Sequence, residues 1–399
     1  MPRSPASRPS VATCSIVTRR IVPPAVAIAV LCATAFSIAG CGSSDSGAHD
    51  PRSSADDPDR QSLNFYTWTD YLAPDTIATF ERQTGIKVRV SYFDTNETLE
   101  SRVLTGNSGF DVVVPTAPFL QRQIESGAYQ TLDKKQLPNL ANLDPSLMSQ
   151  VALNDPGNAH AIIYAWGTYG IGYNEKLVAA ALPNVAPASW RLIFDPAYAA
   201  RLSGCGINIV DEPTGVVRIV LKYLGKDPNA LNPQNLAEIE RVLMSIRPHV
   251  RNINSSSYIE ALANGDICAA VGYNGDFVQA RNRANEAKNG IRIGYVIPEE
   301  GSEMWFDTLA IPRDAPHVAN AHLFINYLMS PPVIANISNS TGFANANAAA
   351  TPLLKASIAS DPAVYPSAQQ RQRLFVQLED SPEQTRAITR LWQRFKTGQ

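Results

Sequence analysis

The sequence predicts an α/β protein with a parallel sheet and two domains, and three observations lead to this expectation. Strand-like and helix-like stretches alternate three times between residues 63 and 125, which is typical of βαβ units. One of these stretches, Phe110–Pro115, is a nearly continuous apolar run, as expected for a strand buried on both faces of a parallel sheet. The chain has 399 residues, which is enough for two hydrophobic cores.

The first domain is expected to begin at Leu63–Ala73, a stretch rich in aromatic and β-prone residues. An Ala-Pro-Asp turn leads from it into the first helix, and a glycine follows each of the first two helices. The polar stretch from Asp133 to Pro156 is expected to form a loop. We predict helices at Pro74–Gly85, Asn96–Thr105 and Pro118–Glu125, and strands at Ile86–Phe93 and Phe110–Pro115.

The chain is expected to cross into the second domain at two strands, His160–Trp166 and Ile171–Asn174, and to return through a strand at Met304–Pro312. The C-terminal helix is marked by Ser381 as a capping residue and Pro382 at the first helical position. The other elements predicted in this half are helices at Gly215–Leu224, Leu236–Ile246, Tyr258–Ala263, Gly275–Asn289, Val318–Met329 and Pro332–Ser338, and strands at Ile267–Tyr273 and Ile291–Ile297.

Residues 1–40 are predicted to be an export signal, because four arginines precede or begin an apolar run that contains no acidic residue. The run ends in Ile38–Cys41, which resembles a lipobox, the site at which bacterial lipoproteins are lipidated on cysteine and cleaved before it. Residues 41–61 are mostly small and polar and are predicted to form a disordered tether. An uncleaved membrane anchor is the alternative, since the apolar run is nearly long enough to span a bilayer.

The five cysteines divide between the predicted signal and the folded body. Cys14 and Cys32 lie in the signal and Cys41 is the predicted lipid site, which leaves Cys205 and Cys268. In an exported protein one remaining pair most simply forms a disulfide, and two buried free thiols are the alternative. The five histidines are scattered singly, so we expect neither a metal site nor another cofactor.

Composition and motifs argue against nucleic-acid binding and against catalysis. The formal charge is −2 although the signal carries four arginines, so the body is more acidic and suits a cationic ligand better than nucleic acid. The sequence contains no Walker loop, nucleophile elbow, paired-histidine metal helix or dinucleotide fingerprint. We therefore expect a binding protein and not an enzyme, and an exported hydrolase with unmarked catalytic residues is the alternative.

An aromatic residue and a carboxylate recur together at the ends of three predicted strands. Aromatic faces attract ammonium groups and cover methylene chains, and a buried carboxylate needs a cationic partner. Each pair alone also fits a packed strand end followed by a helix cap, but three pairs in two domains favour a slot for a linear diamine or polyamine. The pairs are Trp68 with Asp70, Tyr273 with Asp276, and Trp305 with Asp307.

Four stretches resemble the periplasmic polyamine-binding proteins of ABC importers, and the putrescine-binding members most of all. They are Phe-Tyr-Thr-Trp-Thr-Asp-Tyr-Leu-Ala-Pro-Asp from residue 65, Gly-Phe-Asp-Val-Val-Val-Pro-Thr-Ala-Pro-Phe-Leu from 109, Leu-Ala-Asn-Gly-Asp-Ile-Cys from 262, and Phe-Ala-Asn-Ala-Asn-Ala-Ala-Ala-Thr-Pro from 343. The resemblance extends from Leu63 to Gly398. It implies a two-lobed type II periplasmic binding protein fold with the ligand cleft between the lobes. We place lobe 1 at 62–165 and 306–351, and lobe 2 at 166–305 and 352–399.

The resemblance also implies which residues bind the ligand. Asp276 and Asp307 match the carboxylates that hold the amino groups. Asp70 and Arg283 match residues near the lobe closure and could form a latch, whereas a solvated helix face is the alternative for Arg283. The Cys205–Cys268 pair matches cysteines that are bridged in the putrescine-binding relatives. The remaining matches are aromatic walls at Trp68, Tyr273 and Trp305, hydroxyl-bearing positions at Thr69, Tyr71 and Thr116, and the cleft mouth at Phe119.

Several departures from the family pattern concern the length of the polyamine. Gly215 stands where the putrescine pattern has a glutamate, and Glu212 provides an acid where spermidine-type members have one. Gln377 also matches the spermidine type, Phe343 replaces a tyrosine, and Tyr273 replaces a typical tryptophan. A surface acid in a turn is the alternative for Glu212. These positions leave the preference between putrescine and spermidine open.

The sequence as a whole predicts the binding component of an ABC importer, which closes around putrescine or spermidine and delivers it to an inner-membrane permease. We expect a monomer in the periplasm or at the cell surface, anchored to the membrane by lipid on Cys41. The same fold holding another small cationic solute is the alternative.

Overall fold

The computed structural model describes residues 61–399, so that the predicted signal at 1–40, Cys41 and the tether up to residue 60 lie outside the described residues. Nine strands in this part of the chain form one mixed sheet in the order β2-β1-β3-β9-β4-β7-β5-β6, with β8 also paired to β4. They are β1 Ser62–Trp68, β2 Lys87–Phe93, β3 Val112–Val113, β4 Ala161–Asn174, β5 Ile207–Ile209, β6 Asn252–Ile253, β7 Ala269–Tyr273, β8 Ile293–Val296 and β9 Met304–Ala310.

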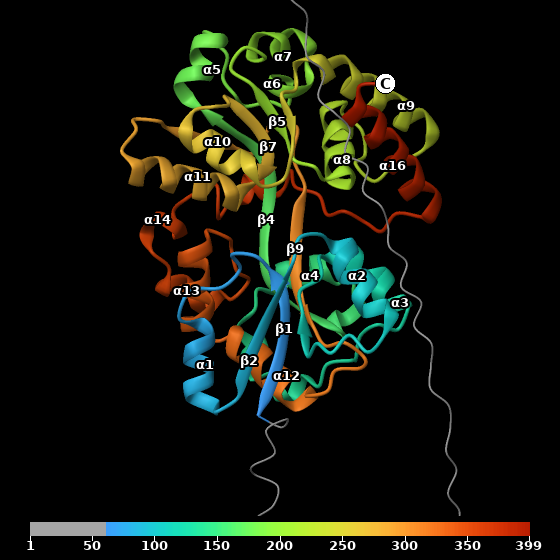
Figure 1. Cartoon of the computed structure of the whole chain (residues 1–399), viewed down its shortest axis with the longest axis vertical. Helices are drawn as coiled ribbons and strands as arrows, with labels where there is room; N and C mark the ends of the chain where they lie inside the picture. The colour runs from blue at the N-terminus through green and yellow to red at the C-terminus, as the bar shows by residue number, and fades with distance from the viewer. Residues whose placement is uncertain (1–60) are drawn as a thin grey trace, which may run out of the picture. The chain divides into compact units, whose positions relative to one another are not determined.

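Two antiparallel strands, β4 and β9, join the two halves of this sheet (Figure 1). The first half of β4 pairs with β9, and its second half, from Tyr169 to Asn174, pairs with β7 and β8. The expected parallel pairing holds within each half, for β1 with β2 and β3 and for β5 with β6 and β7. The prediction of a parallel sheet was wrong only for the two joining strands, which run in opposite directions.

The prediction of two separate strands at His160–Trp166 and Ile171–Asn174 was also wrong, since β4 is continuous. Its glycines resemble turn signals in the sequence, but they serve close packing. A Cβ atom added at Gly167 would lie 2.4 Å from a ring carbon of Trp305, so the absent side chain lets this indole lie against the strand.

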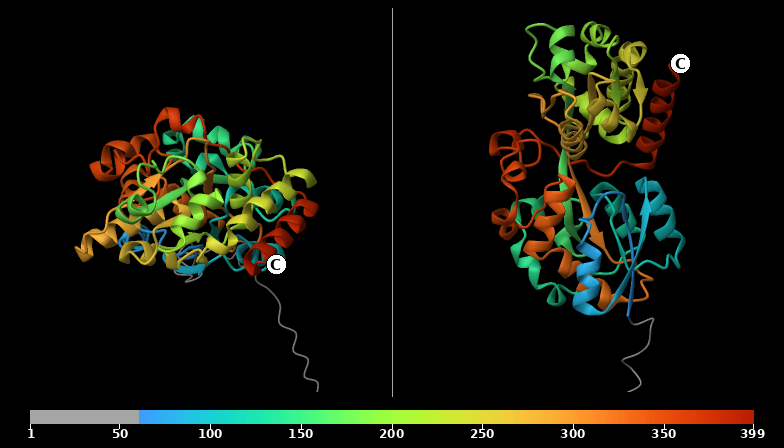
Figure 2. Two further views of the ribbon diagram at one scale, coloured as in Figure 1. Left: turned by 90° about the horizontal axis from the view of Figure 1, so that it is seen from above. Right: turned by 60° about the vertical axis from the view of Figure 1, so that its left-hand side comes forward.

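Helices surround each half of the sheet (Figures 1 and 2). The β1–β3 half is covered by α1 Thr76–Thr84, α2 Asn96–Thr105, α3 Ala117–Glu125, α4 Pro145–Val151, α12 Val318–Leu328 and α13 Pro331–Thr341. The β5–β7 half is covered by α5 Glu175–Ala181, α6 Arg191–Phe194, α7 Pro196–Leu202, α8 Pro213–Tyr223, α9 Pro233–Ile246, α10 Ser257–Asn264, α11 Asn274–Ala287 and α16 Pro382–Thr397. Two short helices, α14 Ala356–Ala359 and α15 Ala368–Arg371, lie in the connection to α16.

Local signals predicted most helix boundaries well. The helix α2 has the predicted bounds, and Ser381 caps α16 by accepting a hydrogen bond from the backbone of Gln384. The loop expected at 133–156 was wrong, because it contains α4 and the short helices η1 Lys134–Gln136, η2 Pro138–Asn142 and the start of η3 Pro156–Asn158. In α4, Leu147 and Val151 lie four residues apart and are both buried, which is the spacing that places two side chains on one helix face.

Cys205 and Cys268 form a disulfide with a Cα–Cα distance of 5.4 Å, as predicted. The bond joins the residues that lead into β5 and β7, two neighbouring parallel strands. Within residues 61–399, no helix combines the length and apolarity needed to cross a membrane. The same residues contain no group of three or more histidine, cysteine, aspartate and glutamate side chains that could hold a metal ion.

Candidate functional site

The candidate site is built on one face of β9 and of the residue that precedes it. Because alternate residues of a strand point to the same side, Glu303, Trp305 and Asp307 share a face. All three side chains are buried. An indole therefore separates two carboxylates along a single extended segment.

Asp307 is held by two hydroxyl groups from the β1–β3 half. The Tyr71 hydroxyl donates to Oδ2 at 2.6 Å and the Thr116 hydroxyl donates to Oδ1 at 2.6 Å. Asp307 is 3% exposed, and burial raises its pKa to about 6, although both hydrogen bonds favour the charged form. The carboxylate is thus oriented by donors, but it forms no ion pair with a basic residue of 61–399.

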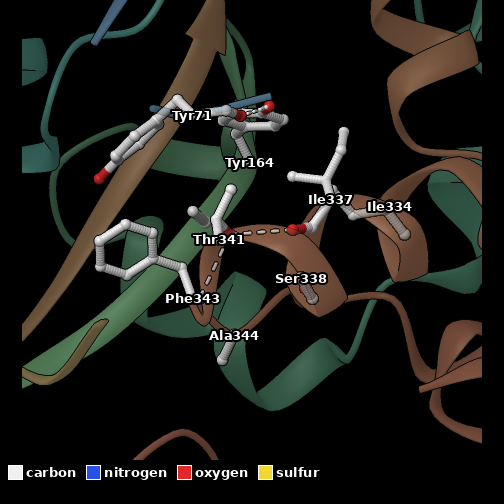
Figure 3. Close-up of a pocket in the computed structure, with 9 residues that line it drawn as sticks. Tyr71, Tyr164, Ile334, Ile337, Ser338, Thr341, Phe343 and Ala344 are labelled. Atoms are coloured by element: carbon white, nitrogen blue, oxygen red, sulfur yellow. Dashed lines mark hydrogen bonds between the residues drawn. The ribbon is translucent and has the colours of Figure 1, made fainter. Parts of the chain in front are cut away.

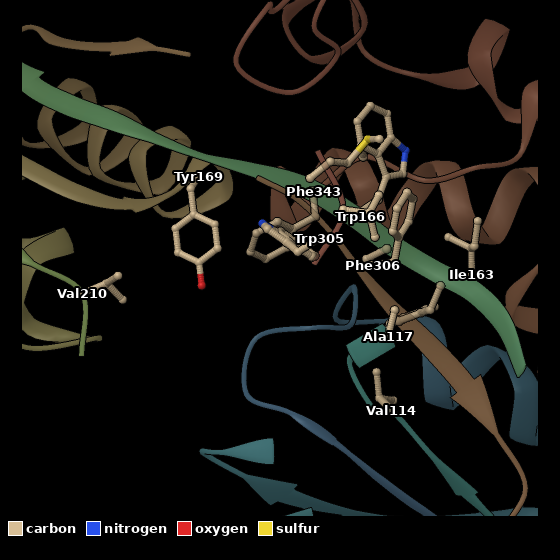
Figure 4. Close-up of a cluster of buried hydrophobic side chains, with 14 of the residues drawn as sticks. Val114, Ala117, Ile163, Trp166, Tyr169, Val210, Trp305, Phe306 and Phe343 are labelled. Atoms are coloured by element: carbon tan, nitrogen blue, oxygen red, sulfur yellow. The ribbon is translucent and has the colours of Figure 1, made fainter. Parts of the chain in front are cut away.

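Trp305 lies at the centre of an aromatic group. The Phe343 ring is 5.5 Å from its ring centroid and the Tyr273 ring 6.1 Å, each edge to face. Figure 4 shows Trp305 beside Phe343, with Tyr169 further along β4. The indole Nε1 of Trp305 is buried without a hydrogen-bond partner among the described residues, so it remains a free donor.

Asp276 comes from the other half of the sheet, in the first turn of α11, directly after β7. The Tyr258 hydroxyl donates a hydrogen bond to its Oδ2. Burial, with a smaller contribution from the charge of Asp70, raises the pKa of Asp276 to about 7, although the Tyr258 hydrogen bond and Arg283 lower it. The charge of Asp70 thus acts on Asp276, so that acidic groups from both halves lie near the same region.

Glu212 caps the N-terminus of α8. Its carboxylate accepts hydrogen bonds from the backbone of Gly215 at 2.6 Å and of Thr214 at 3.2 Å, and from the Tyr169 hydroxyl at 3.2 Å. Burial raises the pKa of Glu212, and these donors oppose the shift. Glu212 stands in the turn before α8 and is partly exposed. Tyr169, which contacts it, shares a hydrogen bond of 3.1 Å with Tyr273.

The candidate residues at the end of β1 and in the β1–α1 connection differ from one another in exposure and in contacts. The Trp68 indole donates to the Val114 carbonyl at 3.1 Å and packs against Phe93. Thr69 and Asp70 are exposed, and Asp70 has a left-handed backbone with φ of 59°. The structure therefore brings Tyr71 into contact with Asp307, while Thr69 makes no such contact among the described residues.

Two further candidates lie at the edges of the site. Phe119 is buried in α3 and carries the Arg122 guanidinium over its ring at 4.1 Å. Gln377 is buried and lies two residues after Phe375, which bridges to Glu303 in parallel register. Its neighbours Val376 and Leu378 both form hydrogen bonds with Asn229.

Tyr71 and Phe343 also line a small pocket against α13 (Figure 3). The Thr341 hydroxyl donates to the Ile337 carbonyl at 2.9 Å and accepts from the Phe343 backbone at 3.3 Å, which fixes the start of the segment that carries Phe343. A larger cavity of about 870 Å³ lies between α9 and α16 and contains none of the candidate residues.

The predicted latch between Asp70 and Arg283 is not formed. Arg283 instead pairs with Glu260 at 3.0 Å. The reason is that α10 and α11 pack side by side and place the Glu260 carboxylate next to the guanidinium. Both partners are substantially exposed, so this pair contributes little stability.

Sequence reasoning missed Glu303 and Tyr169. Glu303 stands two residues before Trp305 and four before Asp307, and this period-two spacing on a predicted strand was the signal that could have found it. Tyr169 lies in the glycine-rich stretch that had been interpreted as a gap between two strands, so its position facing the site was hidden.

Comparison with known proteins places these features in a family. Residues 75–366 match the family described as bacterial extracellular solute-binding protein. The chain is 47% identical to the putrescine-binding periplasmic protein SpuD of Pseudomonas aeruginosa, over 85% of this chain and 93% of the relative. It is 46% identical to the putrescine-binding periplasmic protein PotF of Escherichia coli, over 85% of this chain and 92% of that relative. The structure of the spermidine/putrescine ABC transporter substrate-binding protein PotD of Streptococcus pneumoniae matches with a TM-score of 0.72 at 26% identity, over 85% of this chain and 99% of that one.

Proposed function

The chain belongs to the family of bacterial extracellular solute-binding proteins, and on this premise we propose that it binds a polyamine outside the cytoplasm and delivers it to a membrane permease. Its relatives SpuD and PotF are putrescine-binding proteins, and its structural neighbour PotD is the substrate-binding protein of a spermidine/putrescine ABC transporter. Identity of nearly one half over most of both chains supports carrying this ligand class over to the present protein.

One observation carries the proposal. Burial raises the pKa of four carboxylates, those of Asp276, Asp307, Glu212 and Glu303. None of the four forms an ion pair with a basic residue of 61–399. Buried carboxylates without a cationic partner are costly. A ligand with several ammonium groups would supply the missing partners, and the aromatic rings around Trp305 would cover its methylene groups.

The mechanism is closure of two lobes around the ligand. Tyr71 and Thr116 precede the first joining strand, β4, whereas Tyr273 and Asp276 follow it, so a ligand that contacts both sets favours the closed state. Closure also removes water, which strengthens each ammonium–carboxylate contact. No covalent chemistry is required. The lobe boundaries proposed here, 62–165 with 306–351 and 166–305 with 352–399, are supported by the lengthwise pairing of β4 with β9.

The anchor and the assembly state complete the proposal. We place a lipid on Cys41 after cleavage of the signal at 1–40, and we take the working form to be a monomer that meets an inner-membrane ABC permease. Mass spectrometry of the protein extracted from membranes checks the anchor, because a diacylglyceryl group on Cys41 should be absent from the Cys41→Ser variant. A retained N-terminal segment would instead support the uncleaved anchor.

Thermal unfolding of the purified protein tests the ligand class. Putrescine, cadaverine, spermidine and spermine are added separately, with amino acids and sugars as controls. A ligand present at a hundred times its Kd stabilises the folded state by about 2.7 kcal/mol, which gives a clear rise in the unfolding midpoint. We expect a rise with at least one polyamine and none with the controls. The absence of any rise with all four polyamines would contradict the proposal.

A further inference from the structure

Glu303 is a buried carboxylate that the established features of the site leave unexplained. It is 4% exposed, and its Oε2 atom has no hydrogen-bond partner among the described residues. Its backbone carbonyl accepts from the Tyr169 amide at 3.1 Å, which fixes the residue at the start of β9. An unsatisfied buried oxygen carries a substantial free-energy cost, so its retention calls for a partner that the protein itself does not provide.

The Glu303 carboxylate converges with that of Glu212 on the space above Gly215. A Cβ atom added at Gly215 would lie 2.8 Å from Oε2 of Glu212, 3.0 Å from Oε2 of Glu303 and 3.0 Å from the phenol carbon of Tyr169. The missing side chain at Gly215 therefore lets two carboxylate oxygens and a tyrosine ring approach the same point beside the start of α8. Two carboxylates at such close range attract a cation strongly.

Arg218, the basic residue whose charge acts on Glu303, is already committed elsewhere. Arg218 in α8 pairs with Asp380 at 2.5 Å and donates to the backbone carbonyls of Thr214 and Leu378. Its guanidinium is 1% exposed, so it cannot swing to Glu303 without leaving Asp380 buried and unpaired. No basic residue of 61–399 forms an ion pair with Glu303, so a ligand cation is a suitable partner for it.

The spacing along β9 indicates the length of the ligand. Glu303 and Asp307 are four residues apart on one face, which corresponds to about 13 Å between their Cα atoms. A four-carbon diamine has five bonds of about 1.5 Å between its nitrogens and spans about 6 Å in an extended zigzag. A triamine with nine such bonds between its terminal nitrogens spans about 11 Å, with Trp305 beneath its middle.

We propose that Glu303 and Glu212 form a second cation subsite, which binds the far ammonium group of a triamine while Asp307 and Asp276 hold the near one. The site then selects polyamines longer than a four-carbon diamine. This inference rests on the proposed polyamine-binding function and names the part of the ligand class that the site prefers.

The subsite has a protonation signature. Burial and the neighbouring Glu212 raise the pKa of Glu303 to about 8, and Arg218 opposes the shift. The titratable and charged groups that face Glu303 are Glu212, Arg218, Asp380, Tyr169 and Tyr273. An ammonium group bound there favours the charged carboxylate, so a triamine releases the Glu303 proton at neutral pH, whereas a diamine held at the other end does not.

Isothermal titration calorimetry of Glu303→Gln tests the subsite, with spermidine and putrescine as the ligands. The wild-type protein is expected to bind spermidine more tightly. In the variant, the affinity for spermidine should fall at least tenfold, whereas the affinity for putrescine should change less than twofold. Titrations in two buffers of different ionisation enthalpy count the released protons, and the extra proton released by spermidine should disappear. Glu299→Gln, an exposed neighbour, is the matched control and should change neither value.

Each other outcome has a distinct meaning. An unchanged spermidine affinity in Glu303→Gln, or an equal loss for both ligands, overturns the second subsite but leaves the polyamine-binding function intact. A wild-type protein that binds no polyamine overturns both. If Glu303→Gln does not fold, Gly215→Ala replaces it, because the added methyl group would lie within 3.0 Å of both carboxylates and displace them. This variant should lose spermidine selectively, and retained spermidine affinity would overturn the proposal.

Discussion

Asp307 and Glu303 stand four residues apart on the same face of β9 and are almost equally buried, yet their surroundings differ. Asp307 accepts hydrogen bonds of 2.6 Å from both Tyr71 and Thr116. The Oε2 atom of Glu303 accepts none among the described residues and faces the carboxylate of Glu212. Burial raises both pKa values, but to about 6 for Asp307 and to about 8 for Glu303.

The two carboxylates therefore differ in their protonation state before a cation binds. Hydroxyl donors at Asp307 orient the carboxylate and keep it charged near neutral pH, so that it can bind any ammonium group without first losing a proton. Glu303 stays largely protonated until a cation arrives, because burial, and to a smaller extent the charge of Glu212, opposes its ionisation. We expect the Asp307 end to provide affinity for every polyamine and the Glu303 end to respond to ligand length.

The largest expected effect is the loss of binding in Asp307→Asn. This change removes a buried charge that pairs with the ligand, which typically costs several kcal/mol, so we expect the affinities for putrescine and spermidine both to fall about a hundredfold. Calorimetry with each ligand measures this. Asp94→Asn, at an exposed position near the end of β2, serves as the control. A loss of affinity for only one of the two ligands would contradict the proposal that Asp307 contributes to the binding of every polyamine.

The sequence predicted the boundaries of helices better than it predicted which strands pair and in which direction. Turn glycines and capping residues located α2 and α16 because these signals act within a few residues. The direction of β4 and β9 depends on which distant strands they meet, and alternation along a single strand carries no such information. The glycines of β4 were misinterpreted for the same reason, because Gly167 is explained only by the indole of Trp305, which is far away in the sequence.

The site was predicted unevenly for a similar reason. The aromatic–carboxylate pairing pointed to Asp276 and Asp307, and the family resemblance added Tyr71 and Thr116, which do contact Asp307. Glu303 stands two residues before Trp305, the spacing of two other aromatic–carboxylate pairs, but it lies just outside the predicted strand and matched no motif. Its closeness to Gly215 and Glu212 arises only when α8 is brought next to it, which the sequence alone does not reveal.

A matched pair of tyrosine variants gives the next largest effect. Tyr71→Phe removes the hydroxyl that donates to Asp307 at 2.6 Å, and Tyr169→Phe removes the one that donates to Glu212 at 3.2 Å. Hydrogen bonds to charged groups contribute about 1.5–3 kcal/mol, so Tyr71→Phe should weaken both ligands about tenfold. The longer contact of Tyr169 should matter less and mainly for spermidine. If Tyr169→Phe weakened the binding of putrescine and spermidine equally, the proposed difference between the Asp307 end and the Glu303 end would be contradicted.

The smallest expected effect is the pH dependence of stability without ligand. The pKa of Glu303 is about 8 in the folded state, against an ordinary glutamate value of 4.5. Between these values the folded chain holds a proton that the unfolded chain has released, so the free energy of unfolding falls as pH rises, and the fall ends above pH 8. From pH 7 to 8.5 Glu303 should contribute a loss of about 1 kcal/mol.

The contributions of Asp307 and Glu303 to the pH dependence of stability can be separated between pH 7 and 8.5. Asp307, with a pKa of about 6, has already lost its proton by pH 7. Chemical denaturation at pH 7 and 8.5 should therefore give a smaller loss of stability in Glu303→Gln than in the wild-type protein, whereas Asp307→Asn should lose as much as wild type. Asp276, with a pKa of about 7, accounts for part of the loss that remains in Glu303→Gln. Added spermidine should also reduce the loss, since the bound cation already favours the charged Glu303 at both pH values. An identical loss in wild type and Glu303→Gln would mean that Glu303 ionises freely, and the contrast with Asp307 would then not hold.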